Sequence, residues 1–88
     1  MIKVKKKAQE EFGVEVEQKG TSKEYVVTLE GSYYQYLTQG KVTREELIEK
    51  SFNFLLQRES KEAILSKFNL KIIKGYFPNF EEEIKRTI

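Results

Sequence analysis

The sequence predicts an α+β fold, in which a small antiparallel sheet comes first and three to five helices then pack on one face of it. Residues 12–29 alternate apolar and polar side chains, as a half-buried β-hairpin does. Residues 44–58 repeat apolar side chains at helical spacing. A length of 88 residues, with 34% charged and 39% hydrophobic side chains, predicts a single globular domain over residues 1–88.

The predicted hairpin has one apolar face in each arm. Phe12, Val14 and Val16 share a face in the first arm, and Tyr25, Val27 and Leu29 share a face in the second. Residues 19–22 form the turn, where Gly20 can supply a positive φ. Ile2 and Val4 are candidates for a short third strand, with a helical turn or a loop over residues 5–11.

Two helices are expected after the hairpin. The first is about two turns long, with Ser32 as its N-cap and Gly40 just beyond its end. The second covers residues 44–58 and begins with a capping box of Thr43 and Glu46. Its apolar stripe contains Leu47, Ile48, Ser51, Phe52, Leu55 and Leu56.

The last third of the chain is predicted to be helical as well. Ser60 caps a helix with Ile64, Leu65 and Phe68 on its inner face, and Asn69 ends it and caps the next segment. That segment has Leu70, Ile73 and Phe77 on one face, and Pro78 stops it. A final helix begins after Asn79, and Phe80, Ile84 and Ile88 repeat in it every four residues.

The stretch "YFPNFEEEI" has two interpretations. The acidic run fits the positive end of a helix, with Glu81–Lys85 and Glu82–Arg86 as stabilising pairs, which predicts that the aromatics close the core. The alternative is an exposed aromatic patch for a protein partner, with Tyr76, Phe77 and Phe80 as the binding residues. Because the second interpretation would give the chain a site, these three residues are the candidate partner-binding set.

The composition argues against most catalytic chemistry. The chain has no His, Cys, Asp or Trp, so it lacks imidazole and thiolate metal ligands and the commonest general base. We therefore expect no catalytic residues, no metal and no cofactor, and a Glu- and Lys-based activity is the enzymatic alternative. No apolar run reaches the roughly 18 residues that a membrane span needs, and no secretory signal is present, which fits a cytoplasmic protein.

Charge is distributed unevenly along the chain. The net charge is only +2, but Lys3, Lys5, Lys6 and Lys7 gather at the N-terminus. Lys outnumbers Arg thirteen to three, which argues against bidentate phosphate or base recognition. We therefore expect a non-enzymatic interaction module that binds another protein or itself, with nucleic acid as the weaker alternative.

Residues 52–84, "FNFLLQRESKEAILSKFNLKIIKGYFPNFEEEI", resemble the C-terminal part of a family of small uncharacterised bacterial proteins. The shared features are the "FLL" and "RE" steps of a helix, then "IL", then "YFP" before a closing acidic helix. The resemblance implies a whole bacterial protein and contributes no function.

Residues 24–56 resemble a ribbon–helix–helix unit, with a strand, a short helix, a glycine turn and a second helix. Thr43, Glu46, Leu47 and Ile48 match the polar cap and Glu-Leu-Ile step of that family's second helix. The resemblance implies that two chains pair their strands and read DNA with outward side chains, which here would be Lys23, Val26 and Thr28. Residues 38–56 are also similar to HicB-type antitoxin domains, so a DNA-binding regulator or antitoxin is the alternative function.

Overall fold

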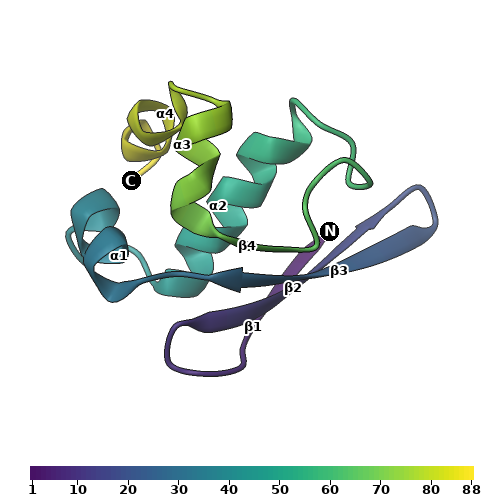
Figure 1. Ribbon diagram of the computed structural model, residues 1–88, viewed down its shortest axis with the longest axis horizontal. Helices are drawn as coiled ribbons and strands as arrows, with labels where there is room; N and C mark the ends of the chain where they lie inside the picture. The colour runs from purple at the N-terminus through teal and green to yellow at the C-terminus, as the bar shows by residue number, and fades with distance from the viewer.

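The computed structural model describes residues 1–88, and its sheet and helices form two layers (Figure 1). The elements in chain order are β1 (Ile2–Lys6), β2 (Glu11–Gln18), β3 (Thr21–Thr28), α1 (Gly31–Thr38), α2 (Arg44–Leu56), β4 (Lys67–Asn69), the 3-10 turn η1 (Leu70–Ile72), α3 (Ile73–Tyr76) and α4 (Phe80–Arg86). The helices lie on one side of the sheet, so the predicted α+β fold is confirmed. None of the helices combines the length and the apolar character that crossing a bilayer requires.

The first three strands form the antiparallel part of the sheet. β1 pairs with β2 and β2 with β3, and the two-residue turn between β2 and β3 places Lys19 and Gly20 at φ values of 55° and 79°. Two consecutive positive φ values are typical of a type I′ hairpin turn. The predicted hairpin and the predicted third strand from Ile2 and Val4 are therefore confirmed.

The sheet has a fourth strand, which the sequence did not predict. β4 pairs in parallel with β3, with Val27 opposite Phe68, so the sheet is mixed and its order is β1-β2-β3-β4. The predicted helix capped by Ser60 is wrong, because residues 57–66 form turns and bends that lead into β4. A parallel partner has to return through a long crossover, and here α1 and α2 occupy that crossover.

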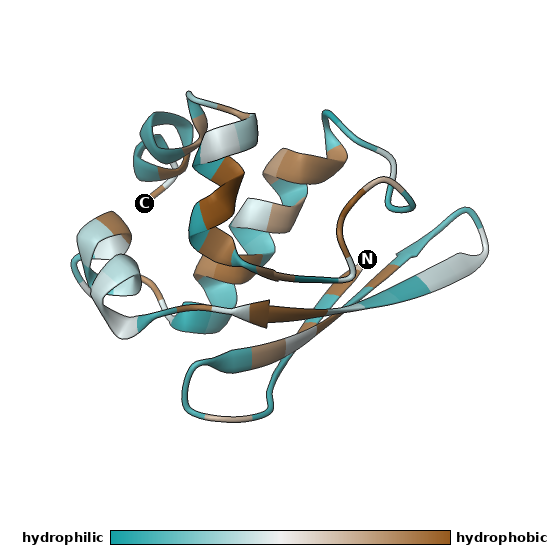
Figure 2. Ribbon diagram, in the orientation of Figure 1, coloured by the Kyte–Doolittle hydropathy of each residue, from teal (hydrophilic) through white to brown (hydrophobic).

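The core lies between one face of the sheet and α2, where hydrophobic stretches of β3, β4, α2 and α3 lie beside one another (Figure 2). Phe52 of α2 is fully buried, and its ring centroid lies 5.1 Å from Tyr25 and 6.0 Å from Phe68. Thr43 and Glu46 make both hydrogen bonds of the predicted capping box, each 3.0 Å long. The helix ends at Leu56, two residues before the predicted end.

Helix α1 begins without the predicted Ser32 cap. Its N-cap position is Glu30, which makes no side-chain cap, and the Glu10 carboxylate instead accepts the Gly31 N–H at 2.8 Å. A residue from the β1–β2 loop thus satisfies a free donor of the first turn. The Asn69 side chain does cap the next segment as predicted, since its Oδ1 accepts the Lys71 N–H at 3.1 Å.

Helix α4 packs on α2 and closes the core. Phe80 is fully buried, and its ring meets Phe54 edge-on at 5.1 Å, as Phe77 does at 5.7 Å. Ile84 is buried beside Phe80, and Ile88 is partly buried. The last helix therefore closes the core with Phe77 and Phe80, as the first interpretation of "YFPNFEEEI" predicts.

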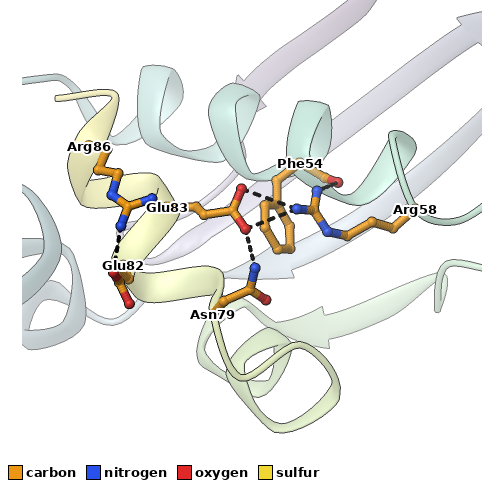
Figure 3. Close-up of polar contacts among 6 residues, drawn as sticks. All are labelled: Phe54, Arg58, Asn79, Glu82, Glu83 and Arg86. Carbon is orange, nitrogen blue, oxygen red and sulfur yellow. Dashed lines mark hydrogen bonds and ion pairs between the residues drawn. The ribbon is translucent and has the colours of Figure 1, made fainter.

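Polar contacts fix α4 against the end of α2 (Figure 3). Arg58 donates to both oxygens of the Glu83 carboxylate at 3.1 and 3.0 Å, and its guanidinium lies 3.7 Å over the Phe54 ring. Asn79 donates its side-chain amide to Glu83 and does not cap the helix.

The predicted Glu82–Arg86 pair forms at 2.6 Å. The predicted Glu81–Lys85 pair does not form, because Glu81 contacts Tyr33 and Lys74 instead.

Candidate partner-binding groove

An open hollow of about 180 Å³ lies between the C-terminal end of α2, the loop before β4, and the η1–α3 segment. Nine of its ten lining residues are hydrophobic, and Glu59 is the exception. We call this hollow the apolar groove. Its buried floor contains Leu55, Phe68 and Ile73, and its rim contains Leu65 and Tyr76.

The local sequence explains why the groove stays open. The residue before a proline avoids the helical region, and Phe77 accordingly has extended angles, φ −131° and ψ 92°, so α3 stops at Tyr76 after a single turn. On the other side, residues 57–66 form no helix that could cover the floor. The short helix α3 and the irregular residues 57–66 therefore flank apolar side chains that belong to the core.

The rim of the groove carries two large exposed hydrophobic side chains. Tyr76 is 69% exposed and Leu65 is 52% exposed. Two of the four large hydrophobic side chains that the fold leaves exposed thus border one hollow, while Met1 and Tyr36 lie outside it. Exposed apolar side chains that gather around one hollow make it a candidate interaction surface.

The cations around the groove are already paired. Arg58 binds Glu83, Lys74 lies 3.8 Å from Glu81, and the buried Lys61 lies 2.9 Å from Glu62. The hydrogen bond from Lys61 is the largest cause that lowers the pKa of Glu62. Because these charges neutralise one another, the groove offers an apolar wall with Glu59 as its one charged lining residue.

The size and chemistry of the groove favour one anchoring side chain. Pockets for drug-sized ligands and cofactors usually enclose about 300–1,000 Å³, whereas an apolar cavity of about 150 Å³ holds one benzene.

The groups with shifted pKa values are Tyr25, Tyr33, Glu46 and Glu62, and none of them lines the groove. No cluster of His, Cys, Asp or Glu side chains is placed to hold a metal ion.

The structure divides the three predicted partner-binding aromatics. Tyr76 stands at the rim, and Phe77 lies partly buried in the wall of the groove. Phe80 is fully buried against Phe54, so its inclusion in a surface patch is corrected: it can support the site but cannot touch a partner. Sequence reasoning missed Leu65, because it placed that residue on the inner face of a helix that does not form.

The three predicted DNA-binding residues do not share a surface. The Lys23 ammonium donates to the carbonyl oxygens of Glu62 and Ile64, at 3.4 and 3.2 Å, on the helix side of the sheet. Val26 and Thr28 alternate with the buried Tyr25 and Val27, so they face the opposite side. Over Val26–Thr28, strand β3 is also paired on both edges, by β2 and β4, so this stretch leaves no edge for the strand of a second chain.

Comparison with known proteins finds no matching protein-family model, no matching curated protein and no matching solved structure. The family resemblances of residues 52–84 and 24–56 therefore stay predictions. The interpretation of the groove depends on its geometry alone.

Proposed function

We propose that the protein is a small, non-enzymatic interaction module of the cytoplasm that binds a protein partner in the apolar groove. The observation that carries this proposal is the exposure of Leu65 and Tyr76 at the mouth of a hollow with an apolar floor. A cytoplasmic setting is compatible with a fold that contains no cysteine and depends on packing alone.

The proposed occupant is one large apolar side chain, presented by a short segment of the partner. The floor of Leu55, Phe68 and Ile73 supplies apolar contacts, and the volume suits a single aromatic or branched side chain. Binding energy at protein interfaces concentrates in such anchors, which surrounding side chains shield from water. Tyr76 suits that shielding role, because its ring is apolar and its hydroxyl can bond to the partner's backbone.

The DNA-binding alternative gains no support from the arrangement of β3. Ribbon–helix–helix pairing needs an open strand edge, and β4 occupies that edge of β3 at Val26–Thr28. Lys23, the only cation of the predicted reading set, is held by two carbonyl groups. The protein partner can also be a second copy of the chain. The solution mass of the purified protein distinguishes such a dimer from a monomer that binds a different protein.

The test compares charge insertions at the rim with a matched control. Leu65→Glu and Tyr76→Glu place a carboxylate in the groove, whereas Tyr36→Glu places one on an exposed tyrosine outside it. All three positions are exposed, so each change should alter the free energy of unfolding by about 0.5 kcal/mol or less. Melting curves of the three variants check that requirement.

The tagged protein is then used to recover partners from an extract of its source cells. We expect one protein to be recovered by the parent and by Tyr36→Glu, and to be lost with both rim variants. If self-association is the interaction, light scattering should show a dimer of the parent that both rim variants convert to a monomer. The proposal is wrong if no recovered protein and no oligomer depends on Leu65 and Tyr76.

A further inference from the structure

Strand β1 forms a free edge of the sheet. It is last in the strand order and pairs only with β2. Met1 and Glu17 exchange two backbone hydrogen bonds, each 2.9 Å long, and this fixes which residues of β1 face β2. Because such pairs alternate along an antiparallel ladder, Lys3 and Lys5 bond to β2, and the N–H and C=O groups of Ile2, Val4 and Lys6 point outward.

The side chains along this edge are of two kinds, apolar and positively charged. Ile2 and Val4 lie partly buried on the helix side of the sheet, packed against the core. Lys3 and Lys5 are exposed on the open face, and Lys6 and Lys7 follow at the end of the strand. Other cations of the chain form five ion pairs, but these four lysines form none and donate no side-chain hydrogen bond.

The carboxylates nearest to this edge form no ion pair with its lysines. Glu15 lies opposite Lys3 in the register, yet the two form no ion pair. The next position of β2, opposite Lys5, is Gly13, which has no side chain, and the aliphatic part of Lys7 lies across it. The outermost strand therefore presents positive charge together with unpaired backbone groups.

We propose that β1 binds an extended acidic segment of a partner protein, which adds to the sheet as a further strand. The preferred segment alternates apolar and acidic residues. Its apolar side chains would continue the row of Ile2 and Val4, and its carboxylates would lie beside Lys3 and Lys5. This surface is separate from the apolar groove, so the proposal does not depend on the function assigned to the groove.

Charge also argues against a second copy of the chain as the occupant. Pairing β1 with another β1 would place lysines opposite lysines, which destabilises a strand pair. Lysines on an edge strand are a common protection against edge-to-edge association of identical sheets. The same charges that oppose self-pairing favour a strand of opposite charge.

The binding test uses a short fluorescent peptide that alternates glutamate and valine, with a peptide that alternates lysine and valine as its control. We expect saturable binding of the acidic peptide alone. Lys3→Glu combined with Lys5→Glu should weaken that binding by about tenfold or more, since two attractive cross-strand pairs become repulsive. Lys41→Glu combined with Lys67→Glu makes the same change in net charge at exposed lysines away from β1, and should change the affinity by about twofold or less.

A second pair of variants tests the backbone pairing itself. Lys6→Pro removes an outward N–H that the fold does not use, whereas Lys6→Ala keeps it. Peptide binding should be weaker for Lys6→Pro than for Lys6→Ala, and the amides of Ile2, Val4 and Lys6 in the parent should gain protection from hydrogen exchange when the peptide binds. Equal binding by the two variants without new protection, or equal binding of a single-stranded oligothymidylate, would identify a general polyanion surface and overturn the proposal.

Discussion

The hydroxyl of Tyr33 on α1 donates a 2.7 Å hydrogen bond to the carboxylate of Glu81 on α4. The two residues are 48 positions apart, so this bond joins the helix that follows the sheet to the helix that ends the chain. Lys74 completes the cluster, with its ammonium 3.8 Å from Glu81 and 5.8 Å from the centre of the Tyr33 ring. The contact holds α4 in the position from which Phe80 reaches the core.

Removing this bond should loosen α4. Tyr33→Phe is expected to lower the free energy of unfolding by about 1–2 kcal/mol, because hydrogen bonds to charged groups are worth more than neutral ones. Denaturant melts of Tyr33→Phe, Glu81→Ala and the double variant measure the coupling between the two side chains, which should be about 1 kcal/mol. Additive effects of the two single changes would show that the bond contributes nothing.

Stability should fall in strongly alkaline solution, partly through Tyr33. Burial, followed by the bond to Glu81, raises the pKa of Tyr33 above its ordinary value of 10.0. An unfolded tyrosine therefore loses its proton at a lower pH than the folded one. This stabilisation is fully present below about pH 10 and is lost as the pH rises toward the folded pKa. Urea melts at about pH 8 and about pH 11 should show a smaller loss for Tyr33→Phe than for the parent. Equal losses would contradict the assignment.

Phe52 should be a principal side chain of the core. It is fully buried between Tyr25 and Phe68, so Phe52→Ala removes contacts with two strands of the sheet at once. The expected cost is about 3–5 kcal/mol of unfolding free energy, measured by urea denaturation. A variant as stable as the parent would show that α2 does not pack on the sheet in this way.

Truncation of two aromatics of the "YFPNF" stretch should change the free energy of unfolding by very different amounts. Phe80→Ala should destabilise the protein by about 3–5 kcal/mol, since the ring is fully buried. Tyr76→Ala should change stability by about 0.5 kcal/mol or less, because its side chain is mostly exposed. Thermal melts of the two variants side by side make the comparison. A large loss for Tyr76→Ala would mean that the tyrosine serves the fold and not a partner.

The N-terminal half of the fold could be predicted from the sequence because its patterns are local. The alternation of residues 12–29 and the capping box of Thr43 and Glu46 each specify an element without reference to distant residues. Strand β4 could not be found in this way. It has only three residues, too few to show a period of two, and its partner β3 is about 40 positions earlier in the chain.

The candidate site could be predicted only in part. Tyr76 and Phe77 were found because aromatics cluster around Pro78, but no local pattern separates a rim aromatic from the buried Phe80. Leu65 was missed because a short apolar run fits a helix as well as a loop and strand. The predicted Glu81–Lys85 ion pair does not form, because Tyr33 and Lys74 contact the Glu81 carboxylate instead. Neither contact follows the i,i+4 helical spacing on which the prediction was based.

The most direct test of the groove as a partner-binding site is photo-crosslinking in living source cells. Tyr76 is replaced by a photoreactive benzophenone amino acid in one strain, and the similarly exposed Tyr36 is replaced in another. We predict one discrete cross-linked product from position 76 that position 36 does not give, and that Leu65→Glu in the same chain abolishes. The absence of any product from position 76, or the same product from both positions, would contradict the assignment of the groove.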